Sequence, residues 1–190
     1  MPIRTEAGWN TIRSDVNDLK KPIIALAVII SSVILAVCLY NQGLFLPGWI
    51  TWKERTSEFE GGTLSLKNRT LAWQKDETIL WQSEPGWLVS DYAVSDFDSD
   101  GREEVLFLLW RKGNYGSSHP FWEEPDTDSF FQHLYIFEPD RNTLKRQWMS
   151  SALLPQFHDW SLEGTKMHVT DAYGESSVWI WQGRGVTRIE

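Results

Sequence analysis

The sequence predicts an all-β domain behind one N-terminal transmembrane helix. Three observations lead to this prediction, and the first two are nineteen uncharged residues from Pro22 to Tyr40 and a later sequence with the periodicity of short strands. The aromatic content is a third, since eleven of the twelve Trp lie after residue 48. A chain of 190 residues with this many large side chains can bury one sizeable core, so a disordered chain is not expected.

Charge and cysteine usage exclude two classes of protein. The formal net charge of −8 and the pI near 5.0 disfavour contact with a phosphate backbone, so no nucleic-acid partner is expected. The single cysteine, Cys38, lies inside the apolar run. The sequence therefore predicts neither a disulfide framework nor a thiolate metal cluster.

The uncharged segment at residues 22–40 is long enough to cross a lipid bilayer. As a helix it would measure about 28 Å, close to the thickness of a bilayer core. Lys20 and Lys21 precede it, and no charge follows until Lys53, so positive-inside reasoning leaves the N-terminus in the cytoplasm. The alternatives are a buried core helix, which no polar face supports, and a cleaved signal peptide, for which no A-x-A-like site follows.

These boundaries divide the chain into four parts. We expect a cytoplasmic tail (1–21), a transmembrane helix (22–40), a juxtamembrane linker (41–55) and an extracytoplasmic β domain (56–190). Trp49 and Trp52, within the linker, fit either an interfacial aromatic belt or the core of the domain.

The β domain contains repeated units. Three segments (70–81, 133–148 and 177–189) have the strand, turn, strand outline of a hairpin. Glycines 61, 101 and 164 each follow an acidic stretch, and an inserted loop at about 112–132 accounts for the longer second interval. Repetition at this spacing is typical of propeller blades. Three units are fewer than a closed propeller needs, so we expect antiparallel, propeller-blade-like sheets in a partial or incomplete propeller, with a loop or second chain covering the open edges.

The stretch DFDSDGREE, residues 96–104, has the oxygen spacing of a calcium loop. Asp96, Asp98 and Asp100 occupy alternate positions, Gly101 permits a sharp turn, and Arg102 and Glu104 follow at the next two alternate places. We expect a structural calcium ion held by carboxylates of the three aspartates and Glu104 and by the backbone carbonyl of Arg102. The EF-hand is excluded, because its twelfth position is Phe107 within a strand-like run. A solvated acidic turn without an ion is the alternative.

The segment AVSDFDSDGREEVLFLLW, residues 93–110, resembles the calcium loop and following strand of the FG-GAP or VCBS repeat. That repeat is the unit of integrin α-type β-propellers, so the resemblance implies blade-like sheets, calcium, and binding or adhesion in place of catalysis. A weaker copy places Asp159, Ser161 and Glu163 at the matching positions, with Met167 in place of Glu104. We expect no metal there.

The inserted loop at 112–132 is the best candidate for a recognition surface, because aromatic rings beside carboxylates suit a sugar or a peptide. The candidate ligand-binding residues are Tyr115, His119, Phe121, Trp122 and Glu123. A flap that covers a sheet edge is an equal alternative.

No enzymatic activity is expected. Glu123 and Glu124, as neighbours in an extended segment, would point to opposite faces and cannot act as a pair of catalytic carboxylates. The four histidines have no metal-binding spacing, and His133 and His168 are expected in strands with ordinary hydrogen bonds.

The sequence thus predicts a calcium-binding module, anchored in the cell membrane by residues 22–40, that recognises a protein or a polysaccharide outside the cytoplasm. The alternative is a structural subunit that completes the β assembly of a partner within an envelope complex or oligomer.

Overall fold

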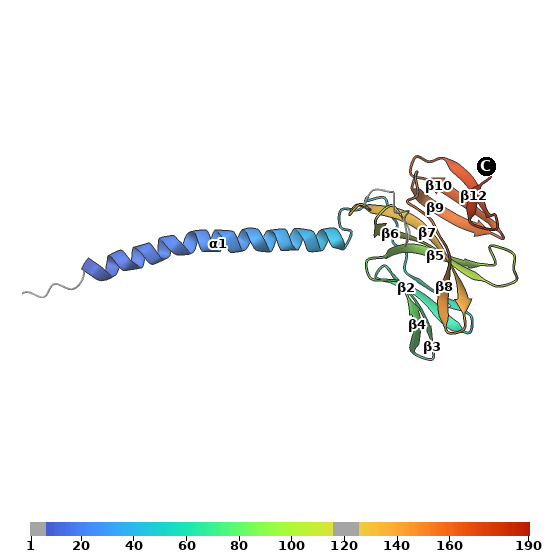
Figure 1. Cartoon of the computed structure of the whole chain (residues 1–190), viewed down its shortest axis with the longest axis horizontal. Coiled ribbons are helices and arrows are strands. Elements are labelled where there is room, and N and C mark those ends of the chain that lie inside the picture. The colour runs from blue at the N-terminus through green and yellow to red at the C-terminus, as the bar shows by residue number, and fades with distance from the viewer. Residues whose placement is uncertain (1–6, 116–125) are drawn as a thin grey trace, which may run out of the picture. The chain divides into compact units, whose positions relative to one another are not determined.

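A computed structural model of the chain describes the backbone of residues 7–115 and 126–190 and the side chains of residues 21–115 and 126–190 (Figure 1). The chain divides into two compact units, Met1–Phe45 and Leu46–Glu190.

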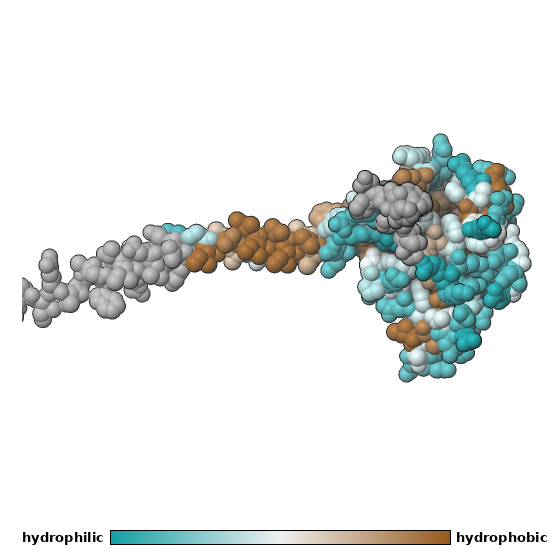
Figure 2. Space-filling model, in the orientation of Figure 1, coloured by the Kyte–Doolittle hydropathy of each residue, from teal (hydrophilic) through white to brown (hydrophobic). Residues whose placement is uncertain are grey.

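The first unit contains one long helix, α1 (Ala7–Asn41), which begins well before the predicted span. Its segment Lys21–Asn41 has a mean hydropathy of 2.9, and its most apolar stretch has no buried residue; Figure 2 shows this stretch as a brown surface. The predicted apolar helix is therefore confirmed. Its length and composition fit a membrane span and equally a signal sequence, while the side on which each end lies remains a prediction.

The described residues of the second unit form three antiparallel sheets, each of four strands joined in sequence order (Figure 1). The first sheet contains β1 (Arg55–Phe59), β2 (Gly62–Lys67), β3 (Thr70–Lys75) and β4 (Thr78–Gln82). The second contains β5 (Leu88–Ser95), β6 (Glu104–Lys112), β7 (Phe130–Asp140) and β8 (Thr143–Met149). The third contains β9 (Phe157–Glu163), β10 (Lys166–Asp171), β11 (Ser176–Trp181) and β12 (Val186–Arg188).

The predicted hairpins and repeats correspond to this arrangement. The three hairpins are β3–β4, β7–β8 and β11–β12, the last two strands of each sheet. Glycines 61, 101 and 164 all lie between the first and second strands of their sheets. The described strands do not close into a ring, so the repeated four-stranded units are confirmed and the propeller remains a prediction.

The two weaker acidic copies differ from the central one. Glu60 and Gly61 form a two-residue turn between the paired residues Phe59 and Gly62. Asp159, Ser161 and Glu163 lie within β9, not in a loop, and Glu163 pairs directly with Lys166. The matching of these residues to the loop positions of DFDSDGREE is therefore wrong, because a tight hairpin leaves no loop in which their side chains could converge.

Two hydrophobic cores lie on opposite faces of the second sheet. Leu64 and Trp73 of the first sheet pack with Val105 and Phe107 in one core. In the other, Leu106 and Leu108 pack with residues of the third sheet, such as Met167. Because alternate strand residues face opposite sides, the run VLFLLW supplies both cores at once. The central strand β6 is thus buried on both faces, which explains why its residues from Val105 to Trp110 are uniformly apolar.

A buried carboxylate on β5 links all three sheets. Asp91 is 5% exposed and accepts hydrogen bonds from Lys53 Nζ at 2.8 Å and from Trp160 Nε1 at 2.8 Å. Arg55 Nη2 lies 2.9 Å from its other oxygen. Since Arg55 belongs to β1 and Trp160 to β9, Asp91 fixes the first strands of the three sheets relative to one another.

The β domain has two distinct ends. At the linker end, Lys53 N donates to Ser90 O, Val89 N donates to Arg69 O, and the ring of Trp49 lies 5.5 Å from that of His158. At the carboxylate end, Ser95 Oγ donates to Gly164 O. We define the linker end by residues 46–53, 68–69, 113–115, 150–156 and 172–175, and the carboxylate end by residues 60–61, 76–77, 96–103, 141–142 and 164–165.

Candidate metal centre

The acidic stretch forms an open loop at the carboxylate end. Ser95 and Glu104 pair at the ends of β5 and β6, which leaves residues 96–103 outside the ladder. The chain reverses through Ser99 (φ 63°) and Gly101 (φ 89°), both in the left-handed region that glycine adopts without strain. The glycine in the middle of the acidic stretch thus permits the turn, as its sequence position predicts.

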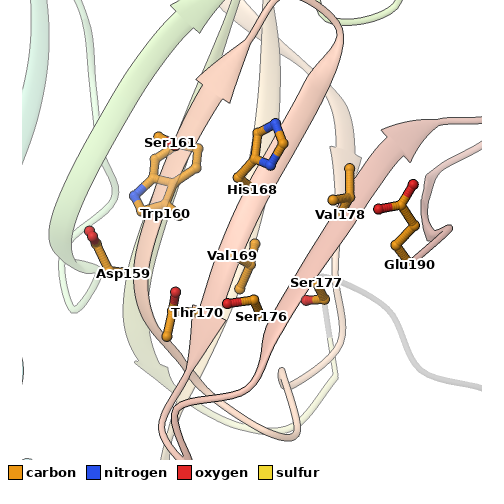
Figure 3. A pocket seen from close by; sticks show the side chains of 10 residues that line it. All are labelled: Asp159, Trp160, Ser161, His168, Val169, Thr170, Ser176, Ser177, Val178 and Glu190. Atoms are coloured by element: carbon orange, nitrogen blue, oxygen red, sulfur yellow. The ribbon is translucent and has the colours of Figure 1, made fainter.

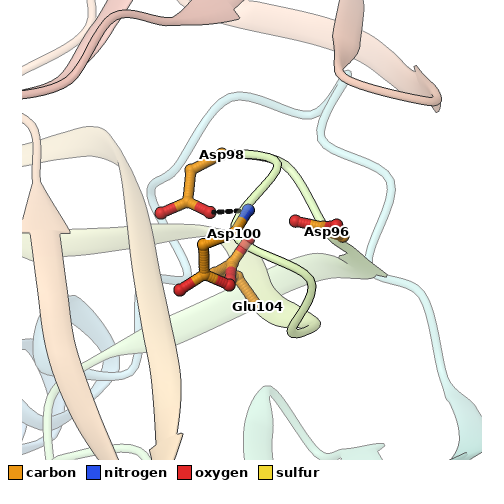
Figure 4. Close-up of side chains that lie close together, drawn as sticks. All are labelled: Asp96, Asp98, Asp100 and Glu104. Carbon is orange, nitrogen blue, oxygen red and sulfur yellow. Dashed lines mark hydrogen bonds between the residues drawn. The ribbon is translucent and has the colours of Figure 1, made fainter.

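The loop brings four carboxylates together. Asp96, Asp98, Asp100 and Glu104 each place one oxygen within 4.8 Å of the others (Figure 4). Calcium binds oxygen at about 2.3–2.6 Å, so ligands on opposite sides of an ion lie about 5 Å apart. The spacing of the four oxygens therefore fits an ion of this size.

The fifth predicted ligand, Arg102, has a different contact in the structure. Its guanidinium group binds Asp100, with Nη2 2.6 Å and Nε 3.1 Å from Oδ2, and Nη2 also lies 3.4 Å from Glu138 Oε2. This side chain neutralises part of the acidic charge and would compete with a cation for Asp100. Coordination by the Arg102 carbonyl remains a prediction.

Backbone hydrogen bonds shape the loop. Phe97 N donates to Glu104 Oε2 at 2.8 Å, Asp100 N to Asp98 Oδ1 at 3.0 Å, and Gly101 N to Asp96 Oδ2 at 3.2 Å. Such bonds are also those of an Asx-turned loop without an ion. They keep the carboxylates in place in either case, so they do not distinguish the two interpretations.

Two buried oxygens at the loop lack a hydrogen-bond donor among the described residues. They are Asp96 Oδ1 and Gln147 Oε1, whose own amide nitrogen donates to Asp98 Oδ2 at 2.7 Å. A buried acceptor without a partner destabilises the folded chain. A cation would satisfy acceptors of this kind, and a hard, oxygen-only donor set is the one that calcium prefers. The residues present therefore fit the ion.

Gln147 is a site residue that the sequence analysis missed. It lies on β8, far from the acidic stretch in sequence, and the folding of both segments into one sheet brings it to the loop. No local spacing could have identified it.

The surroundings of the loop shift the pKa values of two of its carboxyl groups. Glu104 is 1% exposed, and its pKa is raised to about 7, mainly because burial removes water from the carboxyl group, while the charges of Asp98 and Asp100 add to the rise. The hydrogen bond from Phe97 N opposes it. The pKa of Asp100 is lowered, chiefly by the hydrogen bond from the Arg102 side chain. Without a cation, the raised pKa allows Glu104 to take up a proton near neutral pH.

Comparison with models of known families, with curated proteins and with solved structures finds no match for this chain.

The proposed recognition segment is described only at its two ends. Tyr115 follows β6, and Asp126 accepts hydrogen bonds from the backbone N–H groups of Asn114 and Tyr115. Burial raises the pKa of Asp126, but these N–H bonds outweigh that effect and the pKa is lowered. The predicted residues His119, Phe121, Trp122 and Glu123 lie outside the described residues.

The histidines of the β domain that the structure describes occupy strands, as the sequence predicts for two of them. His133 on β7 is fully buried, with Nδ1 3.1 Å from Ser150 O and Nε2 3.0 Å from Gly113 O. His168 on β10 lies 3.4 Å from Glu163 Oε2. Burial lowers the pKa of His133, so its role is that of a buried hydrogen-bonding group.

A shallow polar hollow of about 260 Å³ lies on the outer face of the third sheet (Figure 3). Ser161, His168 and Thr170 line it together with Asp159 and Ser177. No sequence pattern predicts this hollow, because alternate polar residues of a strand are typical of an ordinary solvated face.

Proposed function

We propose that this chain is a membrane-anchored, extracytoplasmic β module that holds a structural calcium ion and recognises a protein or a polysaccharide. The observation that carries the proposal is the convergence of four carboxylates around a buried oxygen, Asp96 Oδ1, that has no donor among the described residues. The apolar segment of α1 supports the anchor. Lys20 and Lys21 support a cytoplasmic N-terminus.

The ion would stabilise the scaffold and take no part in chemistry. It would cross-link the carboxylates of the β5–β6 loop. Through the hydrogen bond between Asp98 and Gln147, it would also connect this loop to β8. All the groups of the cluster point inward, so no coordination position is set aside for a substrate. The recognition surface would be the β6–β7 connection at the other end of the domain, since long loops on a rigid β scaffold often carry binding residues.

A thermal melt of the full chain in detergent micelles, with calcium and with chelator, tests the metal site. Calcium at a hundred times its Kd stabilises the folded state by about 2.7 kcal/mol. For a domain of this size, that stabilisation raises Tm by about 8 °C. Asp96→Asn should abolish the shift, because it keeps the shape of the side chain and removes its charge. Asp76→Asn, in the exposed β3–β4 turn, is the matched control and should retain the shift. If Tm is the same in calcium and in chelator, the metal site is wrong and the loop is a hydrogen-bonded Asx turn without an ion.

Recognition needs its own test. Binding to a glycan or peptide array that disappears in Trp122→Ala and persists in Trp52→Ala would support the β6–β7 connection as the surface. Hydrolysis of any array member would contradict a function limited to binding.

A second function has support from the open strand edges. β1, β4, β5, β8, β9 and β12 each have one unpaired edge among the described strands, and a hollow of about 640 Å³ lies between β1, β5 and β9. Such edges can pair with a strand of another chain. A subunit that completes a partner's β assembly would copurify with one membrane protein in fixed stoichiometry, whereas a recognition module would not.

A further inference from the structure

Gln147 is the extra residue at an irregular point of β8. The neighbouring β7 residues Ile136 and Phe137 pair with Trp148 and Arg146, which are two positions apart. Gln147, which lies between them, is left without a partner in this pairing. Such an arrangement is a β-bulge, which turns a side chain away from the direction that a regular strand would give it. The bulge therefore determines where the Gln147 side chain points.

The first hydrophobic core explains why β8 contains an extra residue. Leu144 belongs to that core and Met149 packs against it, although the two are five positions apart. In a regular strand, an odd interval would place them on opposite faces. One added residue brings both to the same face, but this requirement does not select any particular side chain at position 147. The presence of an amide there needs a separate explanation.

The contacts of the Gln147 amide supply that explanation. Its Nε2 donates to Asp98 Oδ2 at 2.7 Å, a short bond of the kind that a carboxylate acceptor forms. Since a carboxylate only accepts hydrogen bonds, the nitrogen of the amide must face Asp98. Oε1 is then left buried and without a donor among the described residues. Because such an acceptor destabilises the folded chain, the amide is oriented for the acidic loop and not for the stability of β8.

This bond holds Asp98 from outside the loop. Asp98 Oδ1 accepts a bond from Asp100 N at 3.0 Å, within the loop, whereas Oδ2 accepts the bond from Gln147 on another strand. The bonds described above to Asp96 and Glu104 come from the backbone of the loop itself. Gln147 thus connects one carboxylate of the cluster to the ladder of the second sheet. Outer hydrogen-bond partners of this kind orient metal ligands, and their removal weakens metal binding by about 10–100-fold.

We propose that Gln147 is a positioning residue of the metal centre, whose amide N–H holds Asp98 in the orientation that faces a calcium ion. The inference rests on the metal site proposed above and adds a determinant of its affinity that lies on β8. Without the amide, the Asp98 side chain must lose its freedom of rotation when the ion binds, and this loss weakens binding. Substitution of Gln147 should therefore change calcium affinity more than it changes the stability of the ion-free chain.

Calcium titration calorimetry of the full chain in detergent micelles tests the assignment. Gln147→Met keeps the length of the side chain and removes its amide, so the Kd for calcium should rise about tenfold. Its Tm in chelator should change little, because loss of the bond to Asp98 is offset by loss of the donor-less Oε1. Gln147→Asn, whose amide is one methylene too short to reach Asp98, should also raise Kd, so poor folding of one variant does not decide the result. Gln82→Met, at the exposed end of β4, is the matched control and should keep the wild-type Kd.

An Asp98→Ala background tests whether Gln147 acts through Asp98. This substitution already removes the carboxylate that Gln147 positions, so Gln147→Met should raise Kd no further there. A further tenfold rise in this background would mean that Gln147 acts by another route, such as direct contact with the ion, and would overturn the inference.

The outcomes separate this inference from the metal site on which it rests. If the wild-type chain binds no calcium, the metal site and the inference are both wrong. If it binds calcium and both Gln147 variants have the wild-type Kd, only the inference is wrong. A lower Tm in chelator together with an unchanged Kd would give Gln147 a purely structural role and would also overturn it.

Discussion

Replacing Glu104 by Gln should have opposite effects on stability with and without calcium. The substitution removes the charge and preserves an oxygen that can accept the bond from Phe97 N, at 2.8 Å in the wild-type chain. It therefore isolates the electrostatic contribution of the most buried carboxylate of the cluster.

The magnitude follows from the pKa of Glu104, which lies at about 7 in the folded chain against an ordinary value of 4.5. The unfolded chain ionises first, so stability is complete below pH 4.5, falls as pH rises, and reaches its minimum above pH 7. A tenfold difference in proton affinity corresponds to about 1.4 kcal/mol, which gives about 3 kcal/mol at pH 8. Because charges in proteins interact through a high effective dielectric constant, we expect an effect of about 2 kcal/mol.

In chelator at pH 8, we expect Glu104→Gln to melt about 6 °C above the wild-type chain. Well below pH 4.5, the two should melt together, because Glu104 is then protonated in both the folded and the unfolded state. In calcium at pH 8 the order should reverse, because the ion needs the carboxylate and binds a neutral amide less well. Glu103→Gln, at the exposed neighbouring position, should show none of these changes.

Tryptophan fluorescence during thermal unfolding of the full chain in detergent is a suitable assay. If Glu104→Gln melts below the wild-type chain in chelator at pH 8, the burial of the charge does not determine the stability of the loop and the reasoning is refuted. If the difference in Tm between Glu104→Gln and the wild-type chain is the same with and without calcium, Glu104 is not a ligand of the ion.

Three further substitutions test the scaffold by the same thermal melts. Asp91→Asn should destabilise the domain by about 2 kcal/mol, because it leaves two partly exposed cations without their shared carboxylate. Asp140→Asn, at the exposed end of β7, should change Tm little. Gly62→Ala should lower Tm by several degrees, because a Cβ there would lie 2.6 Å from a backbone oxygen of β3; Gly48→Ala, with nothing within 4 Å, should be neutral. Met167→Ala should cost about 3 kcal/mol, since its fully buried side chain fills the core between the second and third sheets. An unchanged Tm in Met167→Ala would contradict the packing described for that core.

Features set by neighbouring residues could be predicted from the sequence. The apolar helix and the three hairpins follow from local periodicity and turn residues, and the acidic loop follows from the alternate carboxylates around Gly101. The location of each repeated glycine between first and second strands was predictable for the same reason.

Features set by distant residues could not be predicted. Asp91 meets Trp160 across 69 positions and Gln147 meets Asp98 across 49, and nothing in either neighbourhood signals the contact. The misassigned copy at Asp159 has a related cause. Its acidic spacing resembles that of the loop, but the pairing of Glu163 with Lys166 closes the hairpin before a loop can form.

Because the central sheet is buried on both faces, the number of four-stranded sheets in this domain cannot change freely. The first and third sheets each turn one apolar face inward, while residues such as Thr63 and Ser65 on one outer face and Ser161 and His168 on the other are polar. The outer sheets thus act as caps for the middle one, as the terminal members of a repeat array do. Duplication of a unit could extend the stack only if a cap also acquired a second apolar face, and deletion of either cap would expose a broad apolar surface that promotes aggregation.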